Sequence, residues 1–174
     1  MDDTIRTKTA LLSLLADNTA GDISPQDVRD MLVSVFGVYG SIYLKDGSTA
    51  QTSIGTTPAK MTGFAADGIS AGTTPDHTND QITVGTDGVY AIFFQNSFSG
   101  TVSADFTFFI RIGGAESVYG VRRKLGTGGD VGSASMLGLL SLSASDVITV
   151  YVEAVSDGRE MTPIQAQLLV IKIA

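Results

Sequence analysis

The length, composition and charge of the chain already exclude several classes of protein. Its 174 residues, 43% hydrophobic and 17% charged, are typical of a globular domain with a short extension rather than of a disordered chain. A net charge of −7 argues against binding of nucleic acid, which needs clustered lysines and arginines, and the absence of cysteine excludes disulfides and thiolate metal sites. No apolar run approaches the roughly 18 residues of a membrane helix, and the acidic start is unlike a secretion signal. Neither nucleic acid nor membrane is expected as a partner.

Two helices are predicted before residue 40. The first is a short helix over residues 4–17, and the second follows Ser24. Ser24 suits the N-cap, Pro25 suits the first helical position, and Asp27 completes the spacing of a capping box. The second helix carries one apolar stripe at helical spacing, formed by Val28, Met31, Leu32, Val35 and Phe36. Because a helix of about three turns is not stable alone in water, this stripe is predicted to dock on another surface.

The remainder of the chain is predicted to consist of short strands separated by turns, several of them Asp-Gly. Apolar and polar residues alternate most clearly in residues 104–112 and 147–154. The predicted strands are 41–45, 59–64, 81–85, 88–95, 104–112, 117–124, 134–142, 147–154 and 165–173, with loops at 65–80 and 126–135. This pattern indicates a mainly β fold, an antiparallel jelly-roll β-sandwich. The predicted domains are a helical N-terminal arm (1–40) and a jelly-roll domain (41–174).

The sequence offers two weak candidates for chemistry. Gly68 to Gly72 match the G-x-S-x-G pattern around Ser70, but the nucleophile elbow needs a following helix, and the next residues are Thr-Thr-Pro. His77 lies between Asp76 and Asp80, a spacing that faintly resembles a calcium loop without its turn glycine and distal glutamate. We therefore predict no catalytic residue, no metal site and no cofactor.

Charged and aromatic clusters suggest surfaces rather than chemistry. The basic run Arg122-Arg123-Lys124 is predicted to mark a charged sheet edge, with a nucleic-acid or glycan contact or an inter-subunit salt bridge as alternatives. Adjacent aromatics in a strand point to opposite faces, so the aromatics of residues 90–109 cannot all enter one core. The excess predicts a homo-oligomer interface, with a ligand groove as the alternative. The interface candidates are Tyr90, Phe93, Phe94, Phe106, Phe108 and Phe109.

Two segments of the β region resemble the jelly roll of the complement globular head and tumour-necrosis-factor families. The first is Ile82-Thr83-Val84 leading into DGVYAIFF (87–94), where a turn glycine precedes a tyrosine and apolar alternation. The second is SLSASDVITVYV (141–152), and QLLVIKI (167–173) matches the closing strand more loosely. The resemblance implies a compact homotrimer with aromatic residues at its threefold interface.

The N-terminal segment SPQDVRDMLVSV (24–35) resembles attachment segments of tailed-bacteriophage virion proteins. The resemblance implies a non-enzymatic structural protein, a trimeric capsid decoration (cement) or head-fibre protein. Its arm would dock on other virion proteins, above all the major capsid protein, in a virion assembled in the host bacterial cytoplasm. The alternative is a module of a tail fibre or tail tip that binds a host surface glycan or receptor through the loops at 65–80 and 126–135.

Overall fold

The computed structural model describes residues 10, 13, 24–35, 37–100, 103–126 and 129–174. The helix predicted over residues 4–17 lies almost wholly outside this part of the chain. The second predicted helix is α2 (Pro25–Val35). Its N-terminus has the predicted capping box, since Ser24 N–H donates to Asp27 Oδ2 at 2.9 Å and Asp27 N–H donates to Ser24 Oγ at 3.2 Å. Gly37 follows the helix with a φ of +106°, a conformation that favours glycine.

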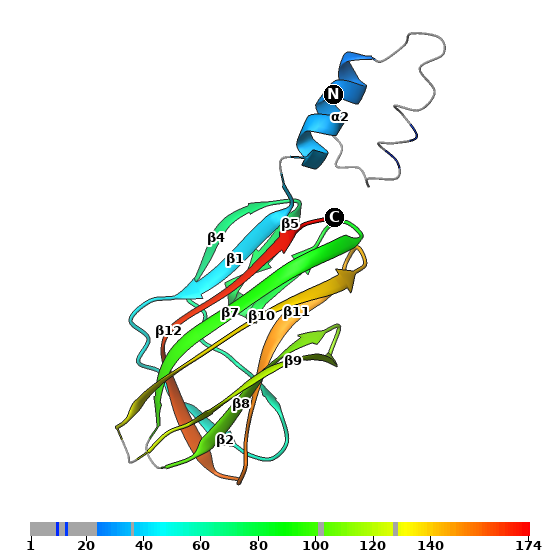
Figure 1. The fold of residues 1–174 in the computed structure, drawn as a ribbon. Coiled ribbons are helices and arrows are strands. Elements are labelled where there is room, and N and C mark those ends of the chain that lie inside the picture. The colour runs from blue at the N-terminus through cyan, green and yellow to red at the C-terminus, as the bar shows by residue number, and fades with distance from the viewer. Residues whose placement is uncertain (1–9, 11–12, 14–23, 36, 101–102, 127–128) are drawn as a thin grey trace.

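The body of the protein is a sandwich of two antiparallel sheets, as predicted (Figure 1). The first sheet runs in the order β10 (Val131–Leu142), β7 (Gly88–Gly100), β12 (Arg159–Lys172), β1 (Tyr39–Leu44) and β4 (Ala66–Ala71), and β2 (Gln51–Ile54) also pairs with β12. The second sheet runs in the order β5 (Thr73–Asp76), β6 (Gln81–Val84), β11 (Val147–Ala154), β8 (Asp105–Ile112) and β9 (Ala115–Lys124), and β3 (Ala59–Lys60) also pairs with β11.

The core lies between the two sheets and is rich in aromatic side chains. Alternate residues of β7 point inward, so Phe94 and Phe98 are buried there. The ring of Phe98 lies edge-on to two rings of β8, with centroids 5.6 Å from Phe106 and 5.0 Å from Phe108. Burial of these rings, together with the aliphatic side chains of the same core, is the main favourable contribution to the stability of the sandwich.

Residues 65–80 were predicted to form a loop, and this prediction is wrong. They contain β4, β5 and a 3₁₀ helix, η1 (His77–Asn79). β4 is the edge strand beside β1, and Gly72, with a φ of +62°, turns the chain from the first sheet into the second. Because β4 buries neither face fully, its residues lack the apolar alternation that marks a strand in a sequence.

Other element boundaries also differ from the prediction. The chain forms a strand at β2, where none was expected, and β10 begins at Val131, inside the predicted loop at 126–135. β1 begins at Tyr39, so the predicted domain division after residue 40 falls inside a strand. Val38 is buried as well, and its carbonyl accepts the N–H of Lys172 at 2.7 Å. The sandwich therefore begins at Val38.

Helix α2 and the C-terminus lie at the same end of the sandwich (Figure 1). α2 projects from the end where β1 begins and β12 stops, and the turn between β11 and β12 lies at the opposite end (Figure 1). Within the described residues, the helices are too short or too polar to cross a membrane.

Candidate assembly surface

The serine of the G-x-S-x-G pattern does not occupy a nucleophile elbow. Ser70 lies within β4 and pairs with Gly40 of β1, and the chain continues through Gly72 into β5 rather than into a helix. A nucleophile elbow instead holds its serine in a sharp turn between a strand and a helix. His77 Nδ1 lies 3.1 Å from Asp67 Oδ1, and the His77 N–H donates to the same oxygen at 2.7 Å. Ser70 is therefore a strand residue paired with β1, whereas His77 lies beside Asp67.

The carboxylates beside His77 hold backbone N–H groups. Asp76 accepts the N–H of Asn79 at 3.0 Å, and its hydrogen bonds with Asn79 lower the pKa of Asp76. Asp80 Oδ1 accepts the N–H groups of Gly63 and Phe64, both at 3.0 Å. Burial raises the pKa of Asp80, against the effect of these two donors. No group of three metal-ligating side chains occurs among the residues that the structure describes.

The basic run lies at a sheet edge, as predicted. Arg122, Arg123 and Lys124 are exposed residues of β9, the last strand of the second sheet. Arg122 Nη2 lies 2.5 Å from Asp105 Oδ2 on the neighbouring strand, so at least one of the three cations pairs within its own chain. Charge on an edge strand discourages pairing with a strand of another chain.

Four of the six aromatic interface candidates are core residues of a single chain. Tyr90, Phe94, Phe106 and Phe108 are buried between the sheets. The Tyr90 hydroxyl donates to the carbonyl of Thr86 at 2.7 Å, and burial raises its pKa. Because these four side chains are covered within the chain, an interface cannot contact them without opening the sandwich. This placement corrects their assignment as interface residues.

The remaining two aromatic candidates point out of the sandwich. Phe109 lies on the outer side of the second sheet, but its own chain covers it: its ring stacks on Tyr151, with centroids 6.4 Å apart. The Arg111 guanidinium lies over both rings, 4.3 Å from the Tyr151 centroid and 5.6 Å from that of Phe109. Phe93 is 39% exposed on the outer side of the first sheet, so it is the one candidate that remains available to a partner.

The docking stripe of α2 is described only in part. Val28 is 41% exposed and Met31 is half-buried. The side chains of Leu32, Val35 and Phe36 lie outside the described part of the structure. Docking of this stripe on a partner stays a prediction.

The strand register arranges the outer face of the first sheet in rows that cross β10, β7, β12 and β1. Four rows follow one another along the strands, starting from the end nearest the arm. We call them the first apolar row, the second apolar row, the amide row and the serine row. The first apolar row is Leu139, Ala91, Ile171 and Tyr39; the second is Leu137, Phe93, Leu169 and Ser41; the amide row is Ser135, Gln95, Gln167 and Tyr43; the serine row is Ser133, Ser97 and Gln165.

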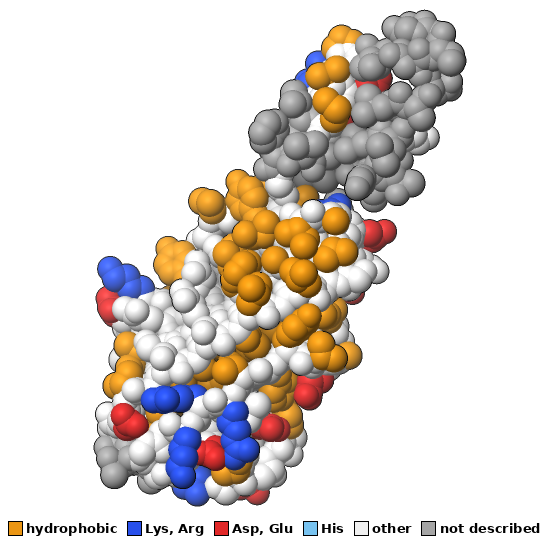
Figure 2. Space-filling model, viewed as in Figure 1, with side chains coloured by type: hydrophobic (Ala, Val, Ile, Leu, Met, Phe, Trp, Pro, Cys, Tyr) orange, Lys and Arg blue, Asp and Glu red, His pale blue; other side chains and the backbone are white. Residues whose placement is uncertain are grey.

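The apolar rows expose large side chains to solvent. Leu137 is 56% exposed and pairs with Phe93, and Leu139 is 53% exposed and pairs with Ala91 in the adjacent row. Figure 2 shows hydrophobic side chains gathered over the half of the sandwich nearest the arm, while lysines and arginines gather at the end away from the arm. A contiguous exposed patch of this kind, bordered by polar residues, is typical of an interaction site.

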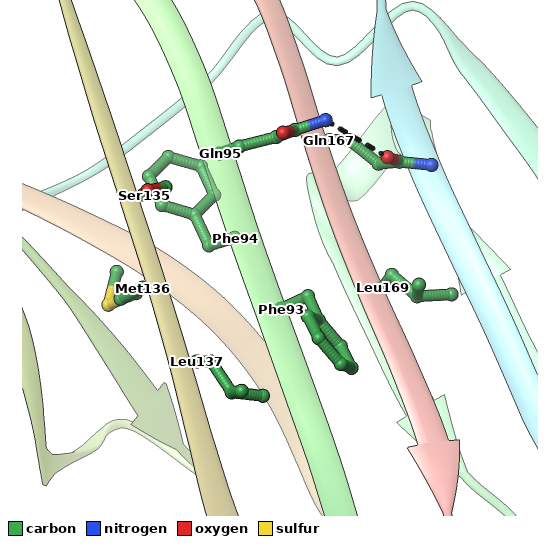
Figure 3. Close-up of a pocket in the computed structure, with 8 residues that line it drawn as sticks. All are labelled: Phe93, Phe94, Gln95, Ser135, Met136, Leu137, Gln167 and Leu169. Carbon is green, nitrogen blue, oxygen red and sulfur yellow. Dashed lines mark hydrogen bonds between the residues drawn. The ribbon is translucent and has the colours of Figure 1, made fainter.

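The four rows carry no charged residue, although the whole chain has a net charge of −7. A shallow hollow of about 380 Å³ lies where the second apolar row meets the amide row, lined by Phe93, Leu137, Leu169, Gln95 and Gln167 among others (Figure 3). A neutral face suits contact between identical acidic chains, because it brings no like charges together.

Most residues of this face were missed at the sequence level. Leu137, Leu139 and Leu169 belong to predicted strands, but their neighbours Gly138 and Leu168 are also apolar or small. Alternation of apolar and polar residues is therefore absent here, and the sequence does not show which side of each strand faces the core. The signal that was applied to the aromatic residues, two apolar faces on one strand, would have found these leucines as well, since one sandwich core can bury only one of the two faces.

No family model matches the chain, and no curated protein matches it. Solved structures do match. Eiger TNF from S. frugiperda aligns with a TM-score of 0.53 and 14% identity, over 79% of this chain and 93% of that one. Murine APRIL aligns with a TM-score of 0.53 and 16% identity, over 78% of this chain and 99% of that one. The globular domain of zebrafish complement 1qA protein aligns at a TM-score of 0.49. At these identities, the match to the first two structures shows a tumour-necrosis-factor-like jelly-roll fold.

Proposed function

We propose that the chain is a non-enzymatic structural module that assembles as a homotrimer through the outer face of its first sheet. The observation that carries this proposal is the pair of apolar rows on a face without charge, in a chain whose net charge is −7. Burial of apolar area contributes about 25 cal/mol per Å², so contact between these rows favours association. Association through a charged face of an acidic protein would instead be opposed by like-charge repulsion.

The proposed number of copies rests on the family resemblance. The family resemblance implies a homotrimer, and the jelly-roll fold on which it rests is the fold of the chain. Three copies related by a rotation axis form a closed ring, in which every chain covers part of a neighbour's apolar rows. A closed ring leaves no copy with an unpartnered apolar face, and this limits further aggregation.

The arm is proposed to attach the trimer to a larger particle, as a capsid decoration or head-fibre protein of a tailed bacteriophage. Two observations support this role: the resemblance of residues 24–35 to virion attachment segments, and the place of α2 beyond one end of the sandwich (Figure 1). With the arm on the particle, and the major capsid protein as its partner, the opposite end of each sandwich would face outward.

The oligomeric state tests the proposed interface. We expect light scattering after size exclusion to report a trimer, and Leu137→Glu to raise the dissociation constant at least about a hundredfold, because a buried unpaired carboxylate costs several kcal/mol. Val118→Glu is the matched control, since Val118 is 88% exposed on β9 of the second sheet. A monomeric parent chain, or a trimer that tolerates Leu137→Glu as well as Val118→Glu, would contradict the proposal.

Removal of the arm tests attachment. A chain without residues 1–36 keeps Val38 and every strand, so we expect it to stay trimeric. It should no longer cosediment with phage capsids stripped of their own copies of the protein, whereas the full chain should bind them. Equal binding by the truncated chain would assign attachment to the sandwich, and no binding by the full chain would overturn the virion role.

A further inference from the structure

The amide row holds a hydrogen-bonded pair of glutamines directly beside the second apolar row. Gln95 Nε2 of β7 donates to Gln167 Oε1 of β12 at 3.3 Å. Figure 3 shows this pair next to Phe93, Leu137 and Leu169, which lie in a row across three strands. Rows on one face of a sheet are two residues apart along each strand, or about 7 Å. A partner that covers the second apolar row therefore reaches the glutamine pair.

The pair leaves one carbonyl oxygen and one amide nitrogen without any hydrogen bond. The bond between the two side chains uses Gln95 Nε2 and Gln167 Oε1, and Gln95 Oε1 and Gln167 Nε2 have no partner among the residues that the structure describes. The free Gln167 amide group points away from Gln95 toward β1 (Figure 3). Each chain thus offers an amide donor on the β12 side of the pair and a carbonyl acceptor on the β7 side.

If the trimer interface buries this pair, the free amide groups need hydrogen-bond partners. A buried amide without a hydrogen bond costs about 1–3 kcal/mol. In a cyclic ring the interface is heterologous, so different parts of the same face meet at each contact. The free donor of one chain then meets the free acceptor of the next, which satisfies both groups without a charge or a ligand. Exchanging O and N in both amides reverses the direction of the ring and leaves this complementarity unchanged.

We propose that Gln95 and Gln167 link the three chains through a closed ring of side-chain amide hydrogen bonds that determines how the copies align. This inference rests on the proposed homotrimer and adds the contact that sets its register. A trimer shifted along the strands by one row would place the glutamines against leucine or phenylalanine. The amide ring therefore selects one alignment, as a single buried polar residue does in a coiled coil.

Three variants test the ring: Gln95→Leu, Gln167→Leu and the double variant. Each single change leaves one buried amide without its partner, so we expect the trimer dissociation constant to rise at least about tenfold in sedimentation equilibrium. The double variant removes both amides, so affinity should return to within about threefold of the parent. Native mass spectrometry should then detect dimers or larger species beside the trimer, because nothing polar opposes other alignments.

Gln81→Leu provides the matched control, because Gln81 is a half-buried glutamine of β6 in the other sheet. Single variants with the same dissociation constant as Gln81→Leu would overturn the ring while the homotrimer stands. A monomeric parent chain would overturn the homotrimer and the ring together. An independent readout is NMR: hydrogen exchange of the Gln95 and Gln167 side-chain amides should be slower in the trimer than that of Gln81, and equal rates would contradict the ring.

Discussion

At the scale of the residue, Asp80 combines a strained backbone with a buried carboxylate. Its φ is +48°, in the left-handed region, and it follows the 3₁₀ helix η1. Its Oδ1 accepts two backbone N–H groups, from Gly63 and Phe64. The spacing with His77 resembled a metal loop in the sequence, but the carboxylate anchors the segment before β4 instead. Only the folded chain brings these residues, 16 and 17 positions apart, together.

The raised pKa of Asp80 predicts a specific dependence of stability on pH. A pKa above the ordinary 3.8 means that the folded chain holds the proton more tightly than the unfolded chain. The stabilisation that comes from the bound proton of Asp80 is therefore complete below pH 3.8 and is lost as the pH rises through the folded pKa, whereas the two hydrogen bonds to Oδ1 remain. Asp80→Asn keeps the Oδ1 acceptor and tolerates a positive φ, so near neutral pH it should be at least as stable as the parent.

Urea unfolding from acidic to neutral pH measures this effect. The difference between Asp80→Asn and the parent should shrink toward zero as the pH falls to the ordinary pKa of 3.8. Asp80→Ala is the control that removes the acceptor, and it should lose about 1–3 kcal/mol because two buried N–H groups lose their partner. If Asp80→Asn were destabilised as much as Asp80→Ala at neutral pH, the prediction would be contradicted, because the negative charge of Asp80 would then be required for stability.

At the scale of the element, Tyr119 closes the sandwich between the edge strands β9 and β10. Its hydroxyl donates to the carbonyl of Leu139 at 3.1 Å, and its ring lies against Gly138. A Cβ at Gly138 would lie 2.4 Å from Cδ2 of Tyr119, closer than any side chain allows. The glycine is thus required by the ring that packs on it rather than by its own backbone conformation.

A double-mutant cycle tests this contact. Gly138→Ala should destabilise the protein by about 1–3 kcal/mol, because the added methyl group displaces the Tyr119 ring. In the Tyr119→Ala background, where the ring is absent, the same change should cost little. Chemical unfolding of the parent, the two single variants and the double variant gives the coupling energy. Equal effects of Gly138→Ala in both backgrounds would show that the methyl group is resisted by something other than Tyr119.

At the scale of the whole molecule, charged residues and exposed apolar residues lie on different parts of the surface. The acidic chain has four rows without charge on the outer face of its first sheet, places the apolar rows on the half nearest the arm, and carries its basic run on the edge strand β9. This arrangement concentrates the favourable contacts of self-association on one face. It also places the proposed trimer interface next to the arm, so that assembly of the heads would bring three arms together.

The sequence determined the elements with local causes. The capping box of Ser24 and Asp27 starts α2 as predicted, and the alternation in β8 and β11 predicted strands and a jelly roll, because helix caps and buried strand faces depend on residues close together in the chain. Tertiary structure decided the rest. Edge strands such as β4 form through pairing with β1, and the burial of Phe94, against the exposure of Phe93, depends on which side of β7 the second sheet covers. The candidate interface is therefore defined by contacts between distant segments, which no local pattern specifies.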